Sequence, residues 1–266
     1  MKFTKMHGLG NDFVLVDCRC EKLEGIDLPQ LAEDVCDRNF GIGADGLILV
    51  LPSDKADARM QIFNPDGSEP EMCGNGIRCF AKYLYDTMEN KKELLSVETK
   101  AGIMLPAVMA EKGQAAAVEV DMGIPQILNT YDLVLSTYDF KIHEVSMGNP
   151  HAVIFVDDLD AVNLQEVGPK IENHPHFPNR TNVEFVKIID RKHIEVKVWE
   201  RGAGETLACG TGACAAVAAA VTEGKTDQEV IVTLPGGNLD IEWNRDDKHI
   251  LMRGPAETVF TGEYTL

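Results

Sequence analysis

The sequence has few basic residues for its length and no long apolar run. Only 25 of its 266 residues are Lys or Arg, against 43 Asp or Glu, so the formal net charge is −18. Nucleic acids and anionic membranes bind positively charged surfaces, so the charge argues against both as partners. No stretch approaches the roughly 20 apolar residues that span a bilayer, and the first residues do not resemble a signal peptide.

The seven cysteines, an odd number, are spread over the whole chain, whereas secreted disulfide frameworks are short and dense in cysteine. We therefore expect reduced thiols and a soluble, cytoplasmic protein. The spacings of Cys73 with Cys79 and of Cys209 with Cys214 are longer than the C-x2-C pair of zinc sites, and neither pair has a neighbouring histidine, so no metal is expected. With 44% apolar residues, the chain can build one large core or two ordinary ones.

Two segments of the sequence resemble each other and lie 136 residues apart. The segments Ile62–Gly76 and Val198–Gly212 align without gaps and share an aromatic residue, a later Glu and a Cys-Gly-x-Gly motif. Weaker matches occur in the same order, such as Gly10 and Asn11 with Gly148 and Asn149. Several matches in one order favour two half-chains of one duplicated fold.

Short apolar runs bounded by Gly, Pro, Asn and Asp predict strands in both halves. They cover residues 13–16, 47–51, 61–63, 152–156, 183–188, 194–199 and 230–234. Helices are predicted over 28–39, 77–84 and 212–221. The last is small and apolar on nearly every side, which predicts a buried helix enclosed by its own sheet. The pattern therefore predicts an α/β or α+β fold, with two similar domains of many short strands around a central helix.

Each half places a cysteine, Cys73 or Cys209, directly before a predicted helix and beside glycines. The N–H groups and dipole of a helix N-terminus stabilise a thiolate, so we expect lowered thiol pKa values. The same N–H groups suit a bound carboxylate. Two such thiols in duplicated halves predict a base and an acid on opposite faces of one substrate carbon. His151 and Glu200 lie beside the repeats and are expected to tune the thiols, while Arg201 suits a substrate carboxylate.

Seven motifs of the chain resemble diaminopimelate epimerase and follow one another in the order of that family. They are Gly8–Phe13, Gly41–Gly46, Asn64–Arg78, Gly148–His151, Thr181–Glu184, Trp199–Gly202 and Ala208–Gly212. Together they cover nearly the whole chain. One position departs from the pattern, because many family members carry Gln where this chain has Gly46. A distal substrate contact is therefore missing there, or is replaced by water or backbone.

The resemblance implies a cofactor-independent epimerase that interconverts LL- and meso-diaminopimelate, in lysine and peptidoglycan precursor biosynthesis. Cys73 and Cys209 are the implied catalytic pair, with His151 and Glu200 adjusting their pKa values. The implied substrate-binding residues are Asn11, Asn64, Gly74, Asn75, Asn149, Asn182, Glu200, Arg201, Gly210 and Thr211. The implied fold has two pseudo-symmetric domains, each a curved, mostly antiparallel sheet wrapped around a central helix. They comprise residues 1–118, to which 255–266 return, and 119–254.

Three other functions fit part of this evidence. A proline or hydroxyproline racemase-type enzyme is similar in plan, but the spaced asparagines and Trp199–Arg201 favour a longer, polar substrate with two charged ends. A phenazine-pathway isomerase is disfavoured because it needs no cysteine pair. A non-catalytic small-molecule binding protein would keep the fold and have unreactive thiols. The predicted partner is a small amino acid, and the oligomeric state stays open, a homodimer included.

Overall fold

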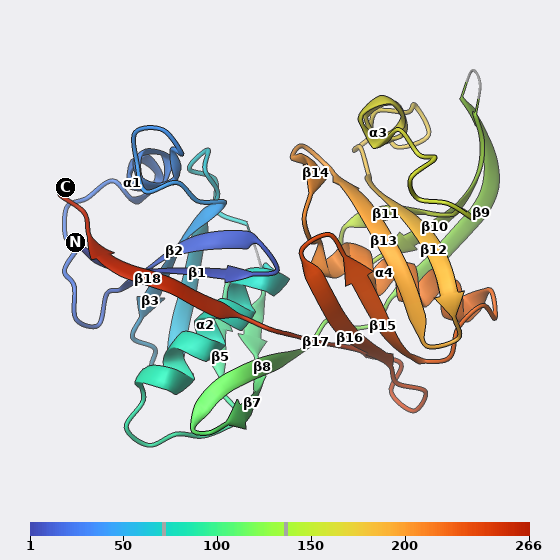
Figure 1. Cartoon of the computed structure of the whole chain (residues 1–266). Coiled ribbons are helices and arrows are strands. Elements are labelled where there is room, and N and C mark those ends of the chain that lie inside the picture. Colours follow the sequence, from blue (N-terminus) through green and yellow to red (C-terminus); the bar gives the residue numbers. More distant parts are fainter. Residues whose placement is uncertain (71–72, 136–137) are drawn as a thin grey trace. The chain divides into compact units, whose positions relative to one another are not determined.

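The computed structural model describes residues 1–70, 73–135 and 138–266, and the chain forms two compact units (Figure 1). Unit 1 comprises Met1–Val120 and Gly254–Leu266, and unit 2 comprises Asp121–Arg253. The returning C-terminal segment binds the start of the chain, since the Met1 amino group donates to the carbonyl oxygen of Tyr264 at 2.8 Å. The domain bounds predicted from the sequence lie close to the bounds of these two units. That the two units arose by duplication stays a prediction.

Unit 1 is built on a seven-stranded sheet of order β18-β1-β2-β3-β4-β5-β6. Its strands are β1 (Lys2–Gly8), β2 (Asn11–Asp17), β3 (Gly46–Leu51), β4 (Ala58–Phe63), β5 (Val97–Thr99), β6 (Gly102–Met104) and β18 (Glu257–Glu263). Two more strands, β7 (Ala107–Glu111) and β8 (Gln114–Asp121), form an antiparallel hairpin. The helices are α1 (Leu28–Cys36) and α2 (Gly74–Thr87). Helix α1 ends before the predicted residue 39, because the Asp37 carboxylate accepts from the N–H groups of Asn39 and Phe40 and turns the chain.

Unit 2 contains a second sheet, of order β9-β10-β11-β12-β13-β15-β16-β17, with β14 paired to β13. The strands are β9 (Gln126–Leu135), β10 (Tyr138–Ser146), β11 (Pro150–Phe155), β12 (Asn182–Asp190), β13 (His193–Glu200), β14 (Gly204–Thr206), β15 (Glu229–Leu234), β16 (Gly237–Trp243) and β17 (Ile250–Gly254). The helices are α3 (Leu164–Glu172) and α4 (Gly210–Thr222). Every strand predicted from the sequence lies within or overlaps one of the observed strands.

The two units repeat one pattern of strand pairing. Across the sheet of unit 1 from β18 to β6, and across that of unit 2 from β9 to β16, successive pairs of neighbouring strands have the same orientations. In order, these pairs are antiparallel, antiparallel, parallel, antiparallel, parallel and antiparallel. The first parallel pair is joined through α1 in unit 1 and α3 in unit 2, and the second through α2 and α4. A parallel pair needs such a crossover connection. The predicted fold class, two similar units of mixed α and β structure, is confirmed.

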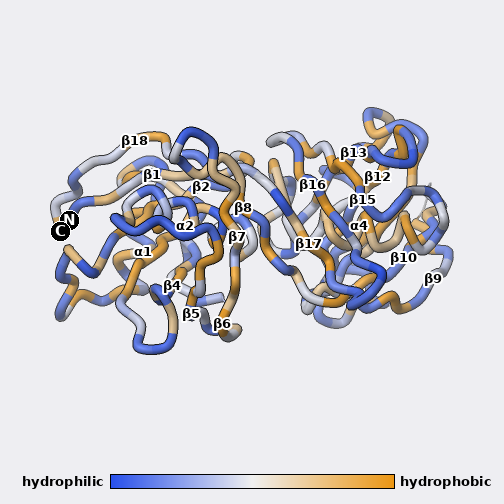
Figure 2. Tube along the Cα trace, turned by 90° about the horizontal axis from the view of Figure 1, so that it is seen from below, coloured by the Kyte–Doolittle hydropathy of each residue, from blue (hydrophilic) through white to orange (hydrophobic). Residues whose placement is uncertain are grey.

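Helix α4 fills the core of unit 2 and packs against β10, β11, β12, β13, β15 and β16. Its residues from Gly212 to Ala220 are all buried. The prediction of an apolar helix enclosed by its own sheet is therefore confirmed. Helix α2 takes the same place in unit 1 against β1–β4. Figure 2 shows hydrophobic and hydrophilic stretches alternating along the chain of each unit.

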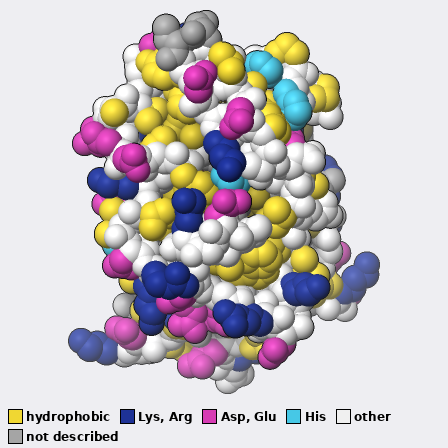
Figure 3. Space-filling view, turned by 90° about the vertical axis from the view of Figure 1, so that its right-hand side faces the viewer, with side chains coloured by type: hydrophobic (Ala, Val, Ile, Leu, Met, Phe, Trp, Pro, Cys, Tyr) yellow, Lys and Arg dark blue, Asp and Glu magenta, His cyan; other side chains and the backbone are white. Residues whose placement is uncertain are grey.

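Acidic side chains lie among the basic ones on the face of unit 2 shown in Figure 3, and hydrophobic side chains are exposed between them. Strand β9 carries three of the exposed apolar residues, Ile127, Leu128 and Val134. None of the helices in the described part of the chain is both long and apolar enough to cross a membrane.

Candidate active site

Cys73 is the N-cap residue of α2, as the sequence predicts. Its backbone is extended (φ −137°, ψ 116°), and its Sγ accepts a hydrogen bond from the N–H of Gly76 at 3.4 Å. Gly74 and Asn75 therefore form the first turn of the helix, where N–H groups point outward along the axis. A side chain at Gly76 would be tightly packed, because an added Cβ would lie 3.2 Å from Cδ1 of Ile62 and 3.4 Å from the Cβ of Cys73.

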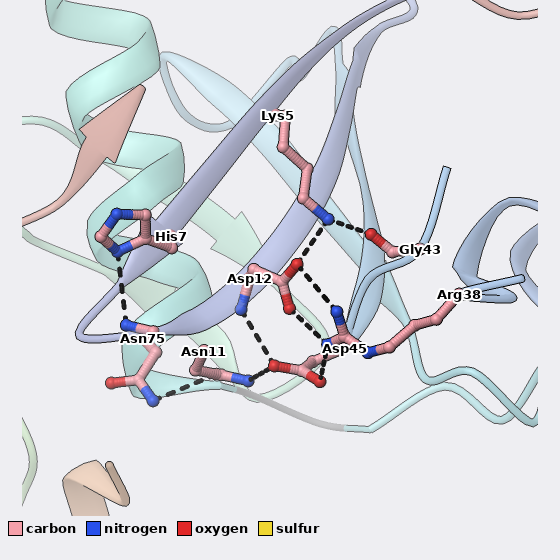
Figure 4. Close-up of polar contacts among 9 residues, drawn as sticks. Lys5, His7, Asn11, Asp12, Arg38, Gly43, Asp45 and Asn75 are labelled. Atoms are coloured by element: carbon pink, nitrogen blue, oxygen red, sulfur yellow. Dashed lines mark hydrogen bonds and ion pairs between the residues drawn. The ribbon is translucent and has the colours of Figure 1, made fainter. Parts of the chain in front are cut away.

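Asn11 lies beside this thiol at the start of β2. Its Oδ1 accepts from Nδ2 of Asn75 at 3.1 Å and lies 4.0 Å from Sγ of Cys73. Its own Nδ2 donates to Oδ2 of Asp45 at 2.9 Å. A carboxylate can only accept, so Asp45 fixes the orientation of the Asn11 amide and directs its carbonyl oxygen towards the thiol. Figure 4 shows Asn11 between Asn75 and Asp45.

Behind Asn11 lies a cluster of two acidic and two basic side chains (Figure 4). Arg38 binds both Asp12 and Asp45 at 2.7 Å, and Lys5 pairs with Asp12 at 2.5 Å and donates to the carbonyl oxygen of Gly43. Burial raises the pKa of Asp12, but the hydrogen bonds from Arg38 and Lys5 outweigh burial and hold that pKa below its usual value. The Asp12 carboxylate therefore stays ionised at neutral pH, and its ion pairs with Lys5 and Arg38 anchor the start of β2 next to Asn11.

Two other positions of unit 1 were singled out in the sequence. Asn64 begins a tight turn, in which its Nδ2 donates to Oγ of Ser68 at 2.9 Å and its N–H donates to the Ser68 carbonyl at 2.8 Å. Gly46 begins β3 and is buried, and an added Cβ would lie 2.9 Å from the carbonyl oxygen of Phe63. The backbone here has no space for the Gln of the family pattern without rearrangement.

Cys209 takes the equivalent place in unit 2, as the N-cap of α4 (φ −121°, ψ 113°). Its Sγ accepts from the N–H of Gly212 at 3.4 Å and lies 3.5 Å from Oγ1 of Thr211. Gly210 and Thr211 form the first turn of the helix. The prediction that both cysteines begin a helix is confirmed.

Burial raises the pKa of the Cys209 thiol well above its ordinary value, and the carboxylates of Glu200 and Glu184 raise it further. The expectation of a lowered pKa is therefore wrong for Cys209. The Thr211 hydroxyl and the Gly212 N–H favour the thiolate, but burial and two nearby acids outweigh them. The sequence motif reveals the helix start, whereas it does not reveal which charges the sheet places beside it.

His151 lies in the interior of unit 2 with Glu184, and neither side chain is exposed to solvent. Nδ1 of His151 lies 2.7 Å from Oε1 of Glu184, and its Nε2 lies 3.0 Å from Oδ1 of Asn149. Asn149 in turn donates through Nδ2 to Oγ1 of Thr211 at 3.2 Å. The structure thus links His151 and Asn149 to the residue that contacts the Cys209 sulfur.

The remaining predicted residues of unit 2 lie at the ends of β12 and β13. Asn182 donates through Nδ2 to the Pro150 carbonyl at 2.9 Å and accepts from the N–H of Arg201 at 2.9 Å. Glu200 accepts from Oγ1 of Thr206 at 2.6 Å. Burial raises the pKa of Glu200, and the neighbouring Glu184 adds to that rise.

No role was predicted from the sequence for Glu184, Asp12 or Asp45, although all three lie inside motifs of the family. A signal for Glu184 was present, since it is the one charged residue among Val183, Phe185 and Val186 in a continuous apolar run. Within the described residues no group of three or more His, Cys, Asp or Glu side chains is arranged to hold a metal ion.

The chain shares its fold with several solved structures. A phenazine biosynthesis protein of the PhzF family from Bacillus anthracis is 20% identical, with a TM-score of 0.78 over 100% of this chain and 99% of that one. A hydroxyproline epimerase from Agrobacterium vitis is 16% identical, with a TM-score of 0.71 over 98% and 91% of the two chains. At these identities the likeness concerns the fold alone.

Sequence similarity, unlike the likeness of fold, identifies the family of the chain. The chain matches the family described as diaminopimelate epimerase over residues 3–128 and 144–259. It is 55% identical to the diaminopimelate epimerase of Pelotomaculum thermopropionicum over 277 aligned positions, which cover 99% of each chain. The chain belongs to the diaminopimelate epimerase family. The family resemblance read from the motifs is confirmed, and the racemase-type alternative is not favoured.

Proposed function

We propose that this protein interconverts LL- and meso-diaminopimelate without a cofactor, using Cys73 and Cys209 as the two proton-transfer groups. One observation carries the proposal. In each unit a cysteine caps the central helix at the same point of the repeated topology, after β4 in unit 1 and after β13 and β14 in unit 2. A structural cysteine has no reason to occupy this place twice, because Ser, Thr, Asp and Asn are the better N-caps.

The reaction needs one thiolate and one thiol on opposite faces of the substrate α-carbon. The thiolate removes the α-proton, so the C–H bond breaks, an S–H bond forms and the electron pair stays on carbon. The opposite thiol then gives its proton to that carbon from the other face, which inverts the centre and leaves this sulfur as the thiolate. The first turns of α2 and α4, with Gly74 and Gly210, supply N–H groups that stabilise the charge developing beside the carboxylate.

Asparagine side chains suit the polar groups of a substrate with two amino-acid ends. Asn11 lies 4.0 Å from the Cys73 sulfur, and Asn149 donates to Thr211, which lies 3.5 Å from the Cys209 sulfur. Asn182 holds the backbone of Arg201. Arg201 offers a guanidinium to a carboxylate at the distal end. We include Asn64 in this set on the family pattern, with Asn75, Glu200 and Thr211.

Proton exchange tests the proposal directly. The purified protein, incubated with LL- or meso-diaminopimelate in heavy water and no added cofactor, is expected to interconvert the two isomers. NMR should show one solvent deuterium at the inverted α-carbon. If diaminopimelate stays unchanged while proline is racemised, the substrate assignment is wrong. If both stay unchanged while either amino acid binds, the protein is a binding protein.

We further propose a homodimer, acting in the cytoplasm, that forms through β18. This strand is at one end of the sheet of unit 1 in the described part of the chain, and its residues Val259 and Phe260 are 54% and 48% exposed. An exposed edge strand with apolar residues is a ready template for pairing with a second copy. Sedimentation should show a dimer for the native protein and a monomer for Phe260→Asp, and a native monomer would contradict the proposal.

A further inference from the structure

The turn between β13 and β14 carries Arg201, which we have proposed as a ligand of the substrate, on an exposed loop. The two strands pair at Glu200 and Gly204, and Gly202 has the left-handed backbone (φ 82°) that this short turn requires. Arg201, Gly202 and Ala203 are all exposed, so burial of apolar surface does not hold them in place. The position of the Arg201 guanidinium therefore depends on the hydrogen bonds that fasten the turn.

Glu172, the last residue of α3, binds this turn on both sides. Its Oε2 accepts from the indole Nε1 of Trp199 at 2.7 Å, and its Oε1 accepts from the N–H of Gly202 at 2.9 Å. Oε1 also accepts from Nη1 of Arg180 at 3.3 Å. One carboxylate thus holds the residue before and the residue after the Glu-Arg pair of the turn.

The place of Glu172 is an unfavourable one for an acid. The side chain is buried, with 6% exposure, and it lies at the C-terminal end of a helix, where the helix dipole disfavours a negative charge. Burial of a carboxylate costs free energy unless its oxygens are hydrogen-bonded. The three groups that contact it are all N–H donors, which suits a group with two accepting oxygens. Fastening the turn is the gain that offsets these costs.

Helix α3 is held close enough to the turn for Glu172 to reach it. Gly168 lies against the ring of Trp199, since an added Cβ would be 2.6 Å from that ring. Nε2 of Gln165 donates to Oε2 of Glu205 on β14 at 2.7 Å. The helix is therefore fastened to both strands that the turn connects.

We infer that Glu172 is a positioning residue that fixes the β13–β14 turn, so that Arg201 is placed to bind the distal carboxylate of the substrate. The inference rests on the proposed function, in which Arg201 has this role. Asn182 assists, because its Oδ1 accepts from the Arg201 N–H at 2.9 Å. The Glu200 side chain is held separately, by Thr206 on β14 at 2.6 Å. Loss of the Glu172 contacts should consequently weaken substrate binding more than it slows proton transfer.

The test uses the full chain with Glu172→Asp, which keeps the negative charge and shortens the side chain by one methylene. The shorter carboxylate cannot reach Trp199 and Gly202 together. KM for diaminopimelate is expected to rise about tenfold and kcat to fall by less than about threefold, because a displaced guanidinium loses its hydrogen bonds to the substrate carboxylate. Amide hydrogen exchange, measured by NMR without substrate, should become faster at Gly202 and stay unchanged in α4. Since the charge is retained, these changes report the position of the turn and not its electrostatics.

Glu166→Asp is the matched control. Glu166 is also an acid of α3, but its carboxylate is exposed and accepts from Lys170 at 3.0 Å. The control should leave KM and the exchange at Gly202 unchanged. An unchanged KM in Glu172→Asp, or an equal rise in Glu166→Asp, would overturn the inference.

A double variant tests whether the effect passes through Arg201. Arg201→Gln alone should raise KM, and Glu172→Asp added to it should raise KM no further, because both changes remove one contact with the substrate. A second rise of about tenfold in the double variant would show that Glu172 acts on the structure in general, and the inference would be wrong. A native protein that leaves diaminopimelate unchanged would contradict the proposed function instead, while the exchange at Gly202 still reports whether Glu172 holds the turn.

Trp199→Phe gives the same test from the other partner, should Glu172→Asp not fold. It removes one donor to Glu172, keeps an aromatic ring against Gly168 and changes no charge. KM should rise about threefold, as for the loss of one hydrogen bond, and this rise should be absent in combination with Arg201→Gln. An unchanged KM in Trp199→Phe, or a rise that persists in the combination, would likewise overturn the inference.

Discussion

Replacing Cys209 by Ser is expected to separate its structural role from its chemical one. Sulfur is a weak hydrogen-bond acceptor, so the Cys209 Sγ, which accepts from the Gly212 N–H at 3.4 Å, is a weak N-cap. A Ser hydroxyl is a preferred N-cap and fits the same extended backbone, so the free energy of unfolding should change by less than about 1 kcal/mol. Cys209→Ala loses both the cap and a buried sulfur, and should be less stable by about 1–2 kcal/mol.

The effect on catalysis should be far larger and nearly the same for both variants. A hydroxyl does not ionise in the range where a thiol does, so neither variant has a proton carrier on that face. Loss of a general acid–base group lowers rates by about 10²–10⁴-fold, and more when two groups act as a unit, so epimerisation should fall by at least about 10³-fold. Cys209→Ser should therefore be more stable than Cys209→Ala, whereas the two variants should epimerise the substrate equally slowly.

One assay measures catalysis and a second measures the stability of the fold. Isomer composition and deuterium content of diaminopimelate are measured in heavy water, and urea unfolding gives stability. The remaining thiol, Cys73, should still exchange the α-proton of one isomer with retention, and Cys73→Ser should show exchange of the other isomer. Cys214→Ala, a buried change on the same helix, should epimerise normally. Epimerisation within tenfold of the native rate in either Cys209 variant would refute the two-thiol mechanism.

Three further predictions concern residues that support the site or the core. Asp45→Asn lets the Asn11 amide turn over, and is expected to raise KM about tenfold with a smaller change in kcat; unchanged steady-state kinetics would contradict this. Gly46→Ala places a Cβ 2.9 Å from a carbonyl oxygen and should lower the free energy of unfolding by about 1–3 kcal/mol, measured in urea. Gly168→Ala should also destabilise the protein, although Ala favours helices by about 1 kcal/mol, because its Cβ would lie 2.6 Å from Trp199; a higher melting temperature would contradict this.

The strands found from the sequence are those with a strong apolar run, such as β3 and β12. Strands β9 and β18 were missed because most of their residues are exposed, and β5 and β6 because three residues are too few for a pattern. Helix α3 was missed because Gly168 and Pro169 lie inside it. Here packing against β12 and β13 outweighs local propensity.

The sequence by itself determined the repeated Cys-Gly-x-Gly motif, the helix starts at Cys73 and Cys209 and the family, because these depend on residues close together in the chain. Only the tertiary structure decided what surrounds each thiol. It placed Glu184 against His151, from neighbouring parallel strands, and Asp45 against Asn11. Burial and the charges brought by these long-range contacts set the pKa of a thiol, so the direction of the Cys209 shift could not be obtained from its local motif.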